Sequence, residues 1–363
     1  MTDLARRALP LLAVVLPIIA LGAILATAGD TLGYDYAAYV GAGHRVIDGQ
    51  PLYDPAVELA GGFAVYLYPP PFATAMVTFA LLPEGVGAWP WVGLLTLAFI
   101  VGVAVMPVGR DIRWVTLLLG GIEWPVLYGL KLGQVSVLLF LLFALAWRWT
   151  SNEGRLGVIA ATGTILKLQP GLLIVWMSLT GRARGAVAAL AIVGVVAVGT
   201  TLIVGVAAWF DYAALLGRVT APVATPHNFT PGAIAYQLGV PDGTATLIQG
   251  GVMIATVVVV LIAVRWATDE ASLLVSVVAT QLLSPLLWDH YAVILLLPVA
   301  WLLQRRHWWA VAIPLALSLP LVNVTPAVTY PIAFVVCLVA PLVVGWRGST
   351  EPASTPRIPT WVG

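Results

Sequence analysis

The sequence predicts an all-α polytopic membrane protein, and three observations support this prediction. Hydrophobic residues make up 61% of the 363 residues, and charged residues make up 9%. The mean hydropathy is +0.99, whereas soluble domains are roughly half apolar and about a quarter charged. Long apolar runs alternate with short basic connections. Because each helical crossing needs about 20 apolar residues, the chain has room for roughly ten spans and for no large soluble domain.

Charge and cysteine content exclude several classes of function. The formal net charge is +1 and the basic residues are scattered, so no nucleic-acid partner is expected. The single cysteine, Cys337, allows neither an intrachain disulfide nor a cysteine metal cluster. The sequence contains no His-Glu-x-x-His box, Walker loop or Gly-x-Ser-x-Gly elbow. We therefore expect no metal and no cofactor.

The first 30 residues resemble a secretory signal, because Arg6 and Arg7 precede an apolar stretch and Ala26-Thr27-Ala28 imitates a cleavage site. The apolar stretch from Ala8 to Leu25 is longer than the usual hydrophobic core of a signal peptide, which has about 7–15 residues. Many further apolar runs follow it. We expect an uncleaved first span.

The apolar runs end at short polar segments, which give the boundaries of the expected helices. These helices are 8–28, 69–84, 88–107, 114–128, 133–148, 156–166, 170–180, 186–209, 246–266, 271–287, 290–304, 308–322 and 327–346. Together they form a single transmembrane domain over residues 1–346. Two long polar segments remain, 29–68 and 210–245, and the Pro/Ser-rich tail 347–363 is expected to be disordered.

Arginine predicts the orientation of the helices. Seven short connections carry arginine, among them "LARRA", "VGRDIR" and "LQRRHWW". The positive-inside rule places such connections, the N-terminus and the tail in the cytoplasm. The polar segments 29–68 and 210–245 then become the first and second outer loops. Residues 69–107 must cross the membrane a net odd number of times.

The two lysines of the chain, Lys131 and Lys167, fall at the outer tips of two predicted hairpins. The second hairpin has 26 residues between Arg155 and Arg182, which is room only for two half-length helices that meet at "LKLQP". Irregular backbone at that depth must be buried in protein or line a wet cavity. An ionisable group there is a functional candidate, and the alternative is a lysine that snorkels to the interface.

Three more polar groups share the predicted outer side. The stretch 33–55 contains Asp35 and four other charged or histidine residues between aromatic residues, and from Tyr36 to Val46 it has the pattern of an interfacial helix. In "SPLLWDHY", Asp289 and His290 are either site residues or a helix cap with an interfacial aromatic neighbour. Asn228 lies in the second outer loop and, like Asn323, also matches a glycosylation sequon.

These residues together resemble glycosyltransferase family 87, whose members are polyprenol-phosphate-mannose-dependent membrane enzymes of the GT-C superfamily. The resemblance covers residues 1–346 and consists of an ordered set of short motifs. The set is Asp35, Tyr39, Gly49 with Leu52-Tyr53-Asp54, Tyr68 to Pro70, Gly133-Gln134, Lys167 with Gln169-Pro170, Asn228, and Ser284-Pro285 with Trp288, His290 and Tyr291.

The resemblance implies a GT-C-like bundle of roughly 10–13 transmembrane or half-membrane helices with its active site in the outer loops. It implies transfer of a hexose, most often mannose, from a polyprenyl-phosphate-sugar donor to a lipid or glycan acceptor. Asp35 is the implied general base of an inverting displacement. Lys167 and His290, with Lys131 and Arg45, are the implied ligands of the donor phosphate. Residues implied in substrate binding are Tyr39, Tyr53, Tyr68, Gln134, Gln169, Asn228, Trp288, Asp289 and Tyr291.

A membrane transporter or lipid flippase is the alternative function, because both classes also need intramembrane charges and broken helices. Transporters place their binding sites near the membrane midplane, between inverted repeats. Here the polar residues are predicted at the outer loops and hairpin tips, and the shared "LKL" of the two hairpins is the single trace of a repeat. This distribution favours an enzyme of the plasma membrane over a transporter.

Overall fold

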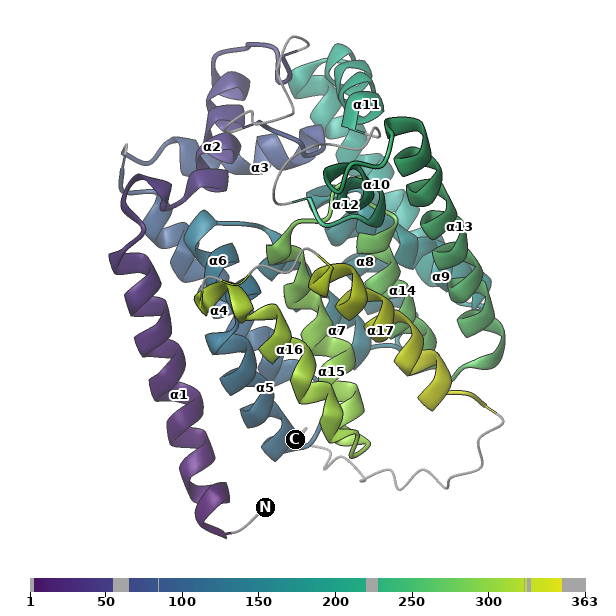
Figure 1. Ribbon diagram of the computed structural model, residues 1–363. Helices are drawn as coiled ribbons and strands as arrows, with labels where there is room; N and C mark the ends of the chain where they lie inside the picture. Colours follow the sequence, from purple (N-terminus) through teal and green to yellow (C-terminus); the bar gives the residue numbers. More distant parts are fainter. Residues whose placement is uncertain are drawn as a thin grey trace, which may run out of the picture.

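The computed structural model describes residues 3–54, 65–83, 85–219, 228–322, 324 and 328–347. Within these ranges the chain forms seventeen α-helices and five short 3-10 helices, and it forms no strand. Most of the helices run between the two ends of one bundle (Figure 1). The predicted all-α polytopic class is confirmed. Glu58, residues 220–227 of the second outer loop, the sequon at Asn323 and the tail after Arg347 lie outside the described residues.

The helices follow the predicted runs closely. The first nine are α1 (Asp3–Ala26), α2 (Tyr34–Ile47), α3 (Pro70–Ala80), α4 (Ala88–Val105), α5 (Arg110–Ile122), α6 (Trp124–Leu132), α7 (Ser136–Arg148), α8 (Glu153–Leu166) and α9 (Leu172–Leu179). The other eight are α10 (Ala183–Val204), α11 (Ala207–Val219), α12 (Pro231–Gln237), α13 (Asp242–Trp266), α14 (Asp269–Leu282), α15 (Leu296–Gln304), α16 (Ala312–Leu317) and α17 (Thr329–Val344).

Four helices within the described ranges are long and apolar enough to cross a membrane alone: α1 from Arg7 on, α4, α10 and α13. The pair α5 and α6 also qualifies, although it is bent by 59°. Five further apolar helices have 10–17 residues. The structure is thus a mixture of full-length and shortened apolar helices.

The predicted break at "LKLQP" is confirmed. Helix α8 has 14 residues and α9 has 8, so at 1.5 Å per residue each is shorter than a hydrocarbon core of about 30 Å. Lys167 ends α8 in an extended conformation, with φ −155° and ψ 139°. A 3-10 turn, Gln169–Gly171, then leads into α9.

The single predicted helix 114–128 is wrong, because the chain breaks at Glu123 between α5 and α6. Glu123 is extended, with φ −78° and ψ 146°. Pro125, the second residue of α6, has no N–H and cannot donate to the carbonyl four residues earlier. The proline therefore starts a new helix, and α6 continues past the predicted end to Leu132.

Residues 69–107, which were expected to cross the membrane a net odd number of times, begin with the short helix α3. It has 11 residues, roughly half the length needed to cross. It packs against α2 so closely that a Cβ on Gly43 would lie 2.9 Å from the Met76 carbonyl oxygen. Both helices lie at the end of the bundle opposite the N-terminus (Figure 1). Within the described residues of this stretch, α4 is the one helix that is long and apolar enough to cross alone.

The basic connections gather at the other end, where α1 begins and α17 ends (Figure 1). Polar contacts link six of the seven connections to one another, and we call this set of contacts the basic ring. Its links are Arg148 to the Val105 carbonyl, Arg182 to the Thr150 carbonyl, Arg182 to Asp269, Arg347 to Asp269, Arg305 to Glu270, and the Gly109 N–H to Gln304. The predicted grouping of the arginine connections at one end is thereby confirmed.

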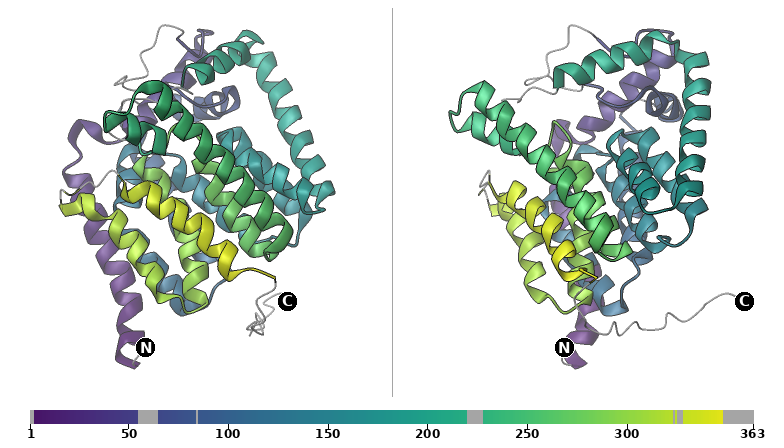
Figure 2. Two further views of the ribbon diagram at one scale, coloured as in Figure 1. Left: turned by 45° about the vertical axis from the view of Figure 1, so that its right-hand side comes forward. Right: turned by 90° about the vertical axis from the view of Figure 1, so that its right-hand side faces the viewer.

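The second outer segment was expected as a polar loop over 210–245, but its described residues, 210–219 and 228–245, are largely helical. The preceding helix ends at Val204 because Gly205 takes a positive φ of 79°, a conformation that favours glycine. Helix α11 follows with Ala208, Tyr212 and Leu215 buried and Phe210 71% exposed. This is the one-sided spacing of an amphipathic helix, and both views in Figure 2 show α11 across the top of the bundle.

Cysteine labelling tests this two-ended arrangement. In a Cys337→Ala background, we expect single cysteines at Asp48 and Asp242 to react with an impermeant thiol reagent from one side of the membrane. Cysteines at Arg184 and Arg110 should react from the other side, because these positions belong to the basic end. All four positions are exposed. If the cysteines at positions 48 and 184 reacted from the same side of the membrane, the two-ended arrangement would be contradicted.

Candidate active site

Asp35 lies in the first turn of α2, half-buried where the helix enters the bundle. The preceding Gly33 has a φ of 70°, and its N–H donates to the Lys131 carbonyl at 2.8 Å. A side chain at Gly33 would be strained at this φ and would touch Ala88. The start of α2 is therefore fixed against the end of α6.

Gln134 connects Asp35 to two tyrosines. Its Nε2 donates to Asp35 Oδ2 at 2.8 Å, and its Oε1 accepts from the hydroxyls of Tyr39 at 2.9 Å and Tyr68 at 2.7 Å. The two hydroxyls lie 3.0 Å apart. Gly133 places the glutamine here, since it ends α6 at a φ of 73°. Gln134 thus fixes the orientation of the Asp35 carboxylate.

The surroundings of Asp35 contain groups that raise the pKa of its carboxyl and groups that lower it. Asp35 belongs to α2, which lies outside the candidate membrane spans. Burial raises the pKa of its carboxyl above the usual range of aspartate. His290, the Gln134 hydrogen bond and Lys167 oppose this change, whereas Asp289 adds to it. A carboxylate with a raised pKa is a better proton acceptor near neutral pH.

Lys167 reaches the site from the break between α8 and α9. Its side chain is 8% exposed. Nζ lies 3.6 Å from the centroid of the Tyr291 ring and 5.6 Å from that of Tyr68, and it has no hydrogen-bond partner among the described residues. The aromatic rings stabilise the ammonium through their π-faces, and its three donors remain available for a ligand.

His290 and its neighbours come from the short 3-10 helix Asp289–Leu295, which we call η3. His290 is 3% exposed, and neither ring nitrogen has a hydrogen-bond partner among the described residues. Its ring packs edge-on against Tyr291, with centroids 4.8 Å apart. Helix α6 comes close at Gly129, where an added Cβ would lie 3.5 Å from the His290 Cβ.

Two amides lie beside the segment that leads into η3. Gln169 Nε2 donates to the Ser284 hydroxyl at 2.6 Å. Asn228 Oδ1 accepts from the backbone N–H of Thr230 at 3.2 Å and of Leu287 at 3.1 Å, and its Nδ2 has no partner among the described residues. The two accepted bonds fix which way the Asn228 amide points. This buried side chain therefore presents a donor of fixed direction.

The structure brings most of the predicted residues together, but not all of them. Arg45 lies ten residues after Asp35 on α2, roughly 15 Å along the helix, and its guanidinium donates to the Leu52 carbonyl. Lys131 is half-buried, with Nζ 6.0 Å from the Tyr128 ring centroid. Tyr53 donates to the Tyr68 carbonyl and therefore supports Tyr68 from behind. Trp288 is half-buried beside His290, with ring centroids 5.7 Å apart.

Sequence reasoning missed Trp124 and Tyr128. Trp124 Nε1 donates to Asp289 Oδ2 at 2.8 Å, and the Trp124 and Tyr128 rings stack with centroids 4.7 Å apart. The signal lay in "EWPVLYG", where a proline and an acidic residue interrupt an apolar run. Ser136 was also missed; its buried hydroxyl has no partner among the described residues and lies near Gly129 and His290.

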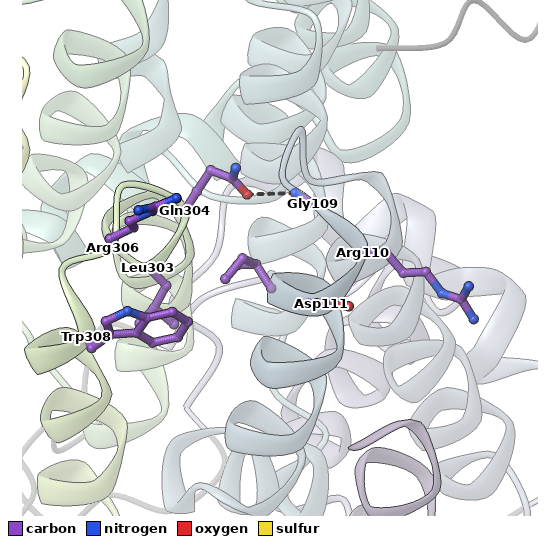
Figure 3. A pocket seen from close by; sticks show the side chains of 8 residues that line it. Gly109, Arg110, Asp111, Leu303, Gln304, Arg306 and Trp308 are labelled. Carbon is purple, nitrogen blue, oxygen red and sulfur yellow. Dashed lines mark hydrogen bonds between the residues drawn. The ribbon is translucent and has the colours of Figure 1, made fainter. Parts of the chain in front are cut away.

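A separate cavity of about 470 Å³ lies at the basic end, between the start of α5 and the end of α15. None of the predicted site residues lines it. Figure 3 shows Arg306 and Trp308 on one side and Arg110 pointing away on the other.

As for metals, no group of three or more His, Cys, Asp or Glu side chains suited to a metal ion occurs in the part of the chain that the structure describes.

Comparison with known proteins defines the family. The family model described as glycosyltransferase family 87 matches residues 66–288. A relative named polyprenol-phosphate-mannose-dependent alpha-(1-2)-phosphatidylinositol pentamannoside mannosyltransferase, from Mycolicibacterium smegmatis, is 30% identical over 255 residues, or 66% of this chain. The chain spans 61% of that relative's length. No solved structure matches. The chain belongs to glycosyltransferase family 87.

Replacement of Gln134 by leucine tests the control of Asp35. The variant loses a hydrogen bond that stabilises the charged carboxylate, so we expect the pKa of Asp35 to rise further. A hydrophobic carbodiimide modifies protonated carboxyl groups, and mass spectrometry resolves the modified site. The pH of half-maximal Asp35 modification should be higher in Gln134→Leu than in the parent. Gln249→Leu, which removes another buried amide, is the control; equal midpoints in all three proteins would contradict the role of Gln134.

Proposed function

We propose that this protein is a membrane glycosyltransferase that moves a hexose, most often mannose, from a polyprenyl-phosphate-sugar donor to a lipid or glycan acceptor. Membership of glycosyltransferase family 87 supports the reaction class. The name of the M. smegmatis relative supports mannose, a polyprenol-phosphate donor and a glycolipid acceptor.

One observation carries the proposal: an oriented carboxylate and a set of buried donors without partners share one site. Asp35 is held by Gln134, and Lys167 and His290 lie close enough to act on its charge. The Lys167 ammonium and both His290 ring nitrogens lack partners within the described residues. Buried polar groups are normally satisfied, so this arrangement suits a ligand that supplies acceptor oxygens. A phosphate bears several such oxygens.

The proposed mechanism is a single displacement. Asp35 accepts the proton of the acceptor hydroxyl while that oxygen bonds to the anomeric carbon of the sugar. The bond from this carbon to the phosphate oxygen breaks at the same time, and its electron pair leaves with the polyprenyl phosphate. Lys167 and His290 stabilise the charge that develops on the phosphate. The configuration inverts, so a β-linked donor gives an α-linked product.

Other predicted residues have supporting roles in the proposal. Tyr291 and Tyr68 hold Lys167, and Asn228, Gln169 and Trp288 bind the sugar or the lipid phosphate. Arg45 donates to the Leu52 carbonyl, and the Lys131 ammonium lies near the Tyr128 ring. In this proposal they bind parts of the donor or acceptor that lie farther from Asp35. No observation favours the transporter or flippase alternative, since Asp35 lies on α2, which is at the end of the bundle opposite the N-terminus (Figure 1).

We place this site on the extracytoplasmic side of the plasma membrane. The basic ring lies at the opposite end of the bundle, and the positive-inside rule assigns that end to the cytoplasm. The N-terminus and the tail 347–363 are then cytoplasmic. Residues 1–346 form one catalytic domain in this proposal.

Asp35→Asn tests the proposed base. The variant keeps the shape of the side chain but removes the proton acceptor, so sugar transfer should fall by about 10² to 10⁴-fold while the protein folds normally. The assay uses purified protein, radiolabelled polyprenyl-phosphate-mannose and a lipid acceptor extract. Asp48→Asn, at an exposed position just after the opposite end of α2, is the matched control. Near-parental transfer by Asp35→Asn would remove Asp35 from its role.

Lys167→Met tests the phosphate site. The change removes an ammonium without a hydrogen-bond partner among the described residues, so we expect little loss of thermal stability and donor affinity at least about tenfold lower. Donor affinity is measured by binding of polyprenyl-phosphate-mannose to purified protein. Arg110→Met, which removes an exposed cation at the basic end of the bundle, serves as the control for loss of a positive charge. Donor affinity within about threefold of the parent would exclude Lys167 from phosphate binding.

A further inference from the structure

Asp289 is a buried carboxylate whose two oxygens already have donors. Its side chain is 2% exposed. The Trp124 indole N–H donates to Oδ2 at 2.8 Å, and the backbone N–H of His290 donates to Oδ1 at 3.0 Å. Hydrogen bonds to an ionised acceptor are stronger than those between neutral groups. The carboxylate is thus fixed from both sides.

The His290 imidazole lies just beyond this arrangement. Its Nδ1 is 3.6 Å from Asp289 Oδ1, too long for a hydrogen bond. A small rotation of the carboxylate would nevertheless bring Oδ1 within hydrogen-bond distance of the imidazole. Loss of the indole would remove one donor from the buried Oδ2, and a small rotation toward the imidazole would replace that donor.

The break between α5 and α6 places the indole. Trp124 is the first residue of α6, directly after the extended Glu123. Its ring stacks on Tyr128, one turn later, at an interplanar angle of 13°. The Tyr128 ring in turn lies 6.3 Å from the His290 ring. The start of α6 and the stacked Tyr128 ring therefore fix the position of the indole, and the Tyr128 ring lies between the indole and the imidazole.

We propose that Trp124 is a positioning residue, which holds the Asp289 carboxylate away from the His290 imidazole and so keeps the imidazole free for the substrate phosphate. This inference rests on the proposed function. In the parent protein the carboxylate is occupied by the indole and the backbone, and it does not compete with the phosphate for the imidazole N–H. Without the indole, Asp289 takes that N–H for itself.

Trp124→Phe tests the proposal, because it removes the indole N–H and keeps an aromatic ring to stack on Tyr128. The stabilisation of charge on the phosphate is needed most in the transition state. We therefore expect kcat to fall by about ten- to a hundredfold, with donor affinity within about threefold of the parent. Trp147→Phe is the matched control, since the buried Trp147 indole N–H has no partner among the described residues; its kcat should stay within about twofold of the parent.

A double variant separates positioning from packing. If Trp124 acts through Asp289, Trp124→Phe/Asp289→Asn should have the same kcat as Asp289→Asn alone. Multiplied losses, or a parental kcat for Trp124→Phe, would overturn the proposal, and thermal melting of each variant shows whether it is folded. A parent protein that neither transfers mannose nor binds polyprenyl phosphate would overturn the proposed function together with this inference. Parental activity with an unaffected Trp124→Phe would overturn the inference alone.

Discussion

The architecture depends on one constraint: backbone N–H and carbonyl groups cannot be left without partners in a hydrocarbon environment. The chain nevertheless breaks its apolar helices at Glu123, at Lys167 and between Leu282 and Asp289. The three breaks meet. Trp124 bonds to Asp289, Gln169 bonds to Ser284, and Lys167 lies on the Tyr291 ring. Each break supplies polar partners to the others, and the polar centre that results is the candidate site.

Much of the fold could be predicted because apolar runs and basic connections are local signals. The break at "LKLQP" followed from arithmetic alone, since 26 residues between arginines cannot form two full spans. The break at Glu123 was missed because Pro125 lies inside a long apolar run, where a kinked helix and two helices have the same composition. Helix α11 was missed because its buried face is a narrow stripe between polar residues.

The site was predictable as a set of residues but not as a geometry. Asp35, Gln134, Lys167 and His290 were each found by residue type and motif, and they converge in the structure. Gln134 was expected to bind substrate, whereas its observed contacts are with Asp35 and two tyrosines. Arg45 shares a helix with Asp35 but lies near its other end. Sequence order places residues on elements, and helix pitch and packing decide which of them meet.

The basic ring has a consequence for how the protein is made. Helices enter the membrane in the order of synthesis, so links between early connections, such as Arg148 to the Val105 carbonyl, can form first. The link from Gly109 to Gln304 joins residues 195 positions apart, and the link from Arg347 to Asp269 waits for the synthesis of α17. The ring therefore closes only after Gln304 has been synthesised. Until then the early helices stay free to rearrange, and a ribosome that stalls before Gln304 leaves an open bundle for quality control to recognise.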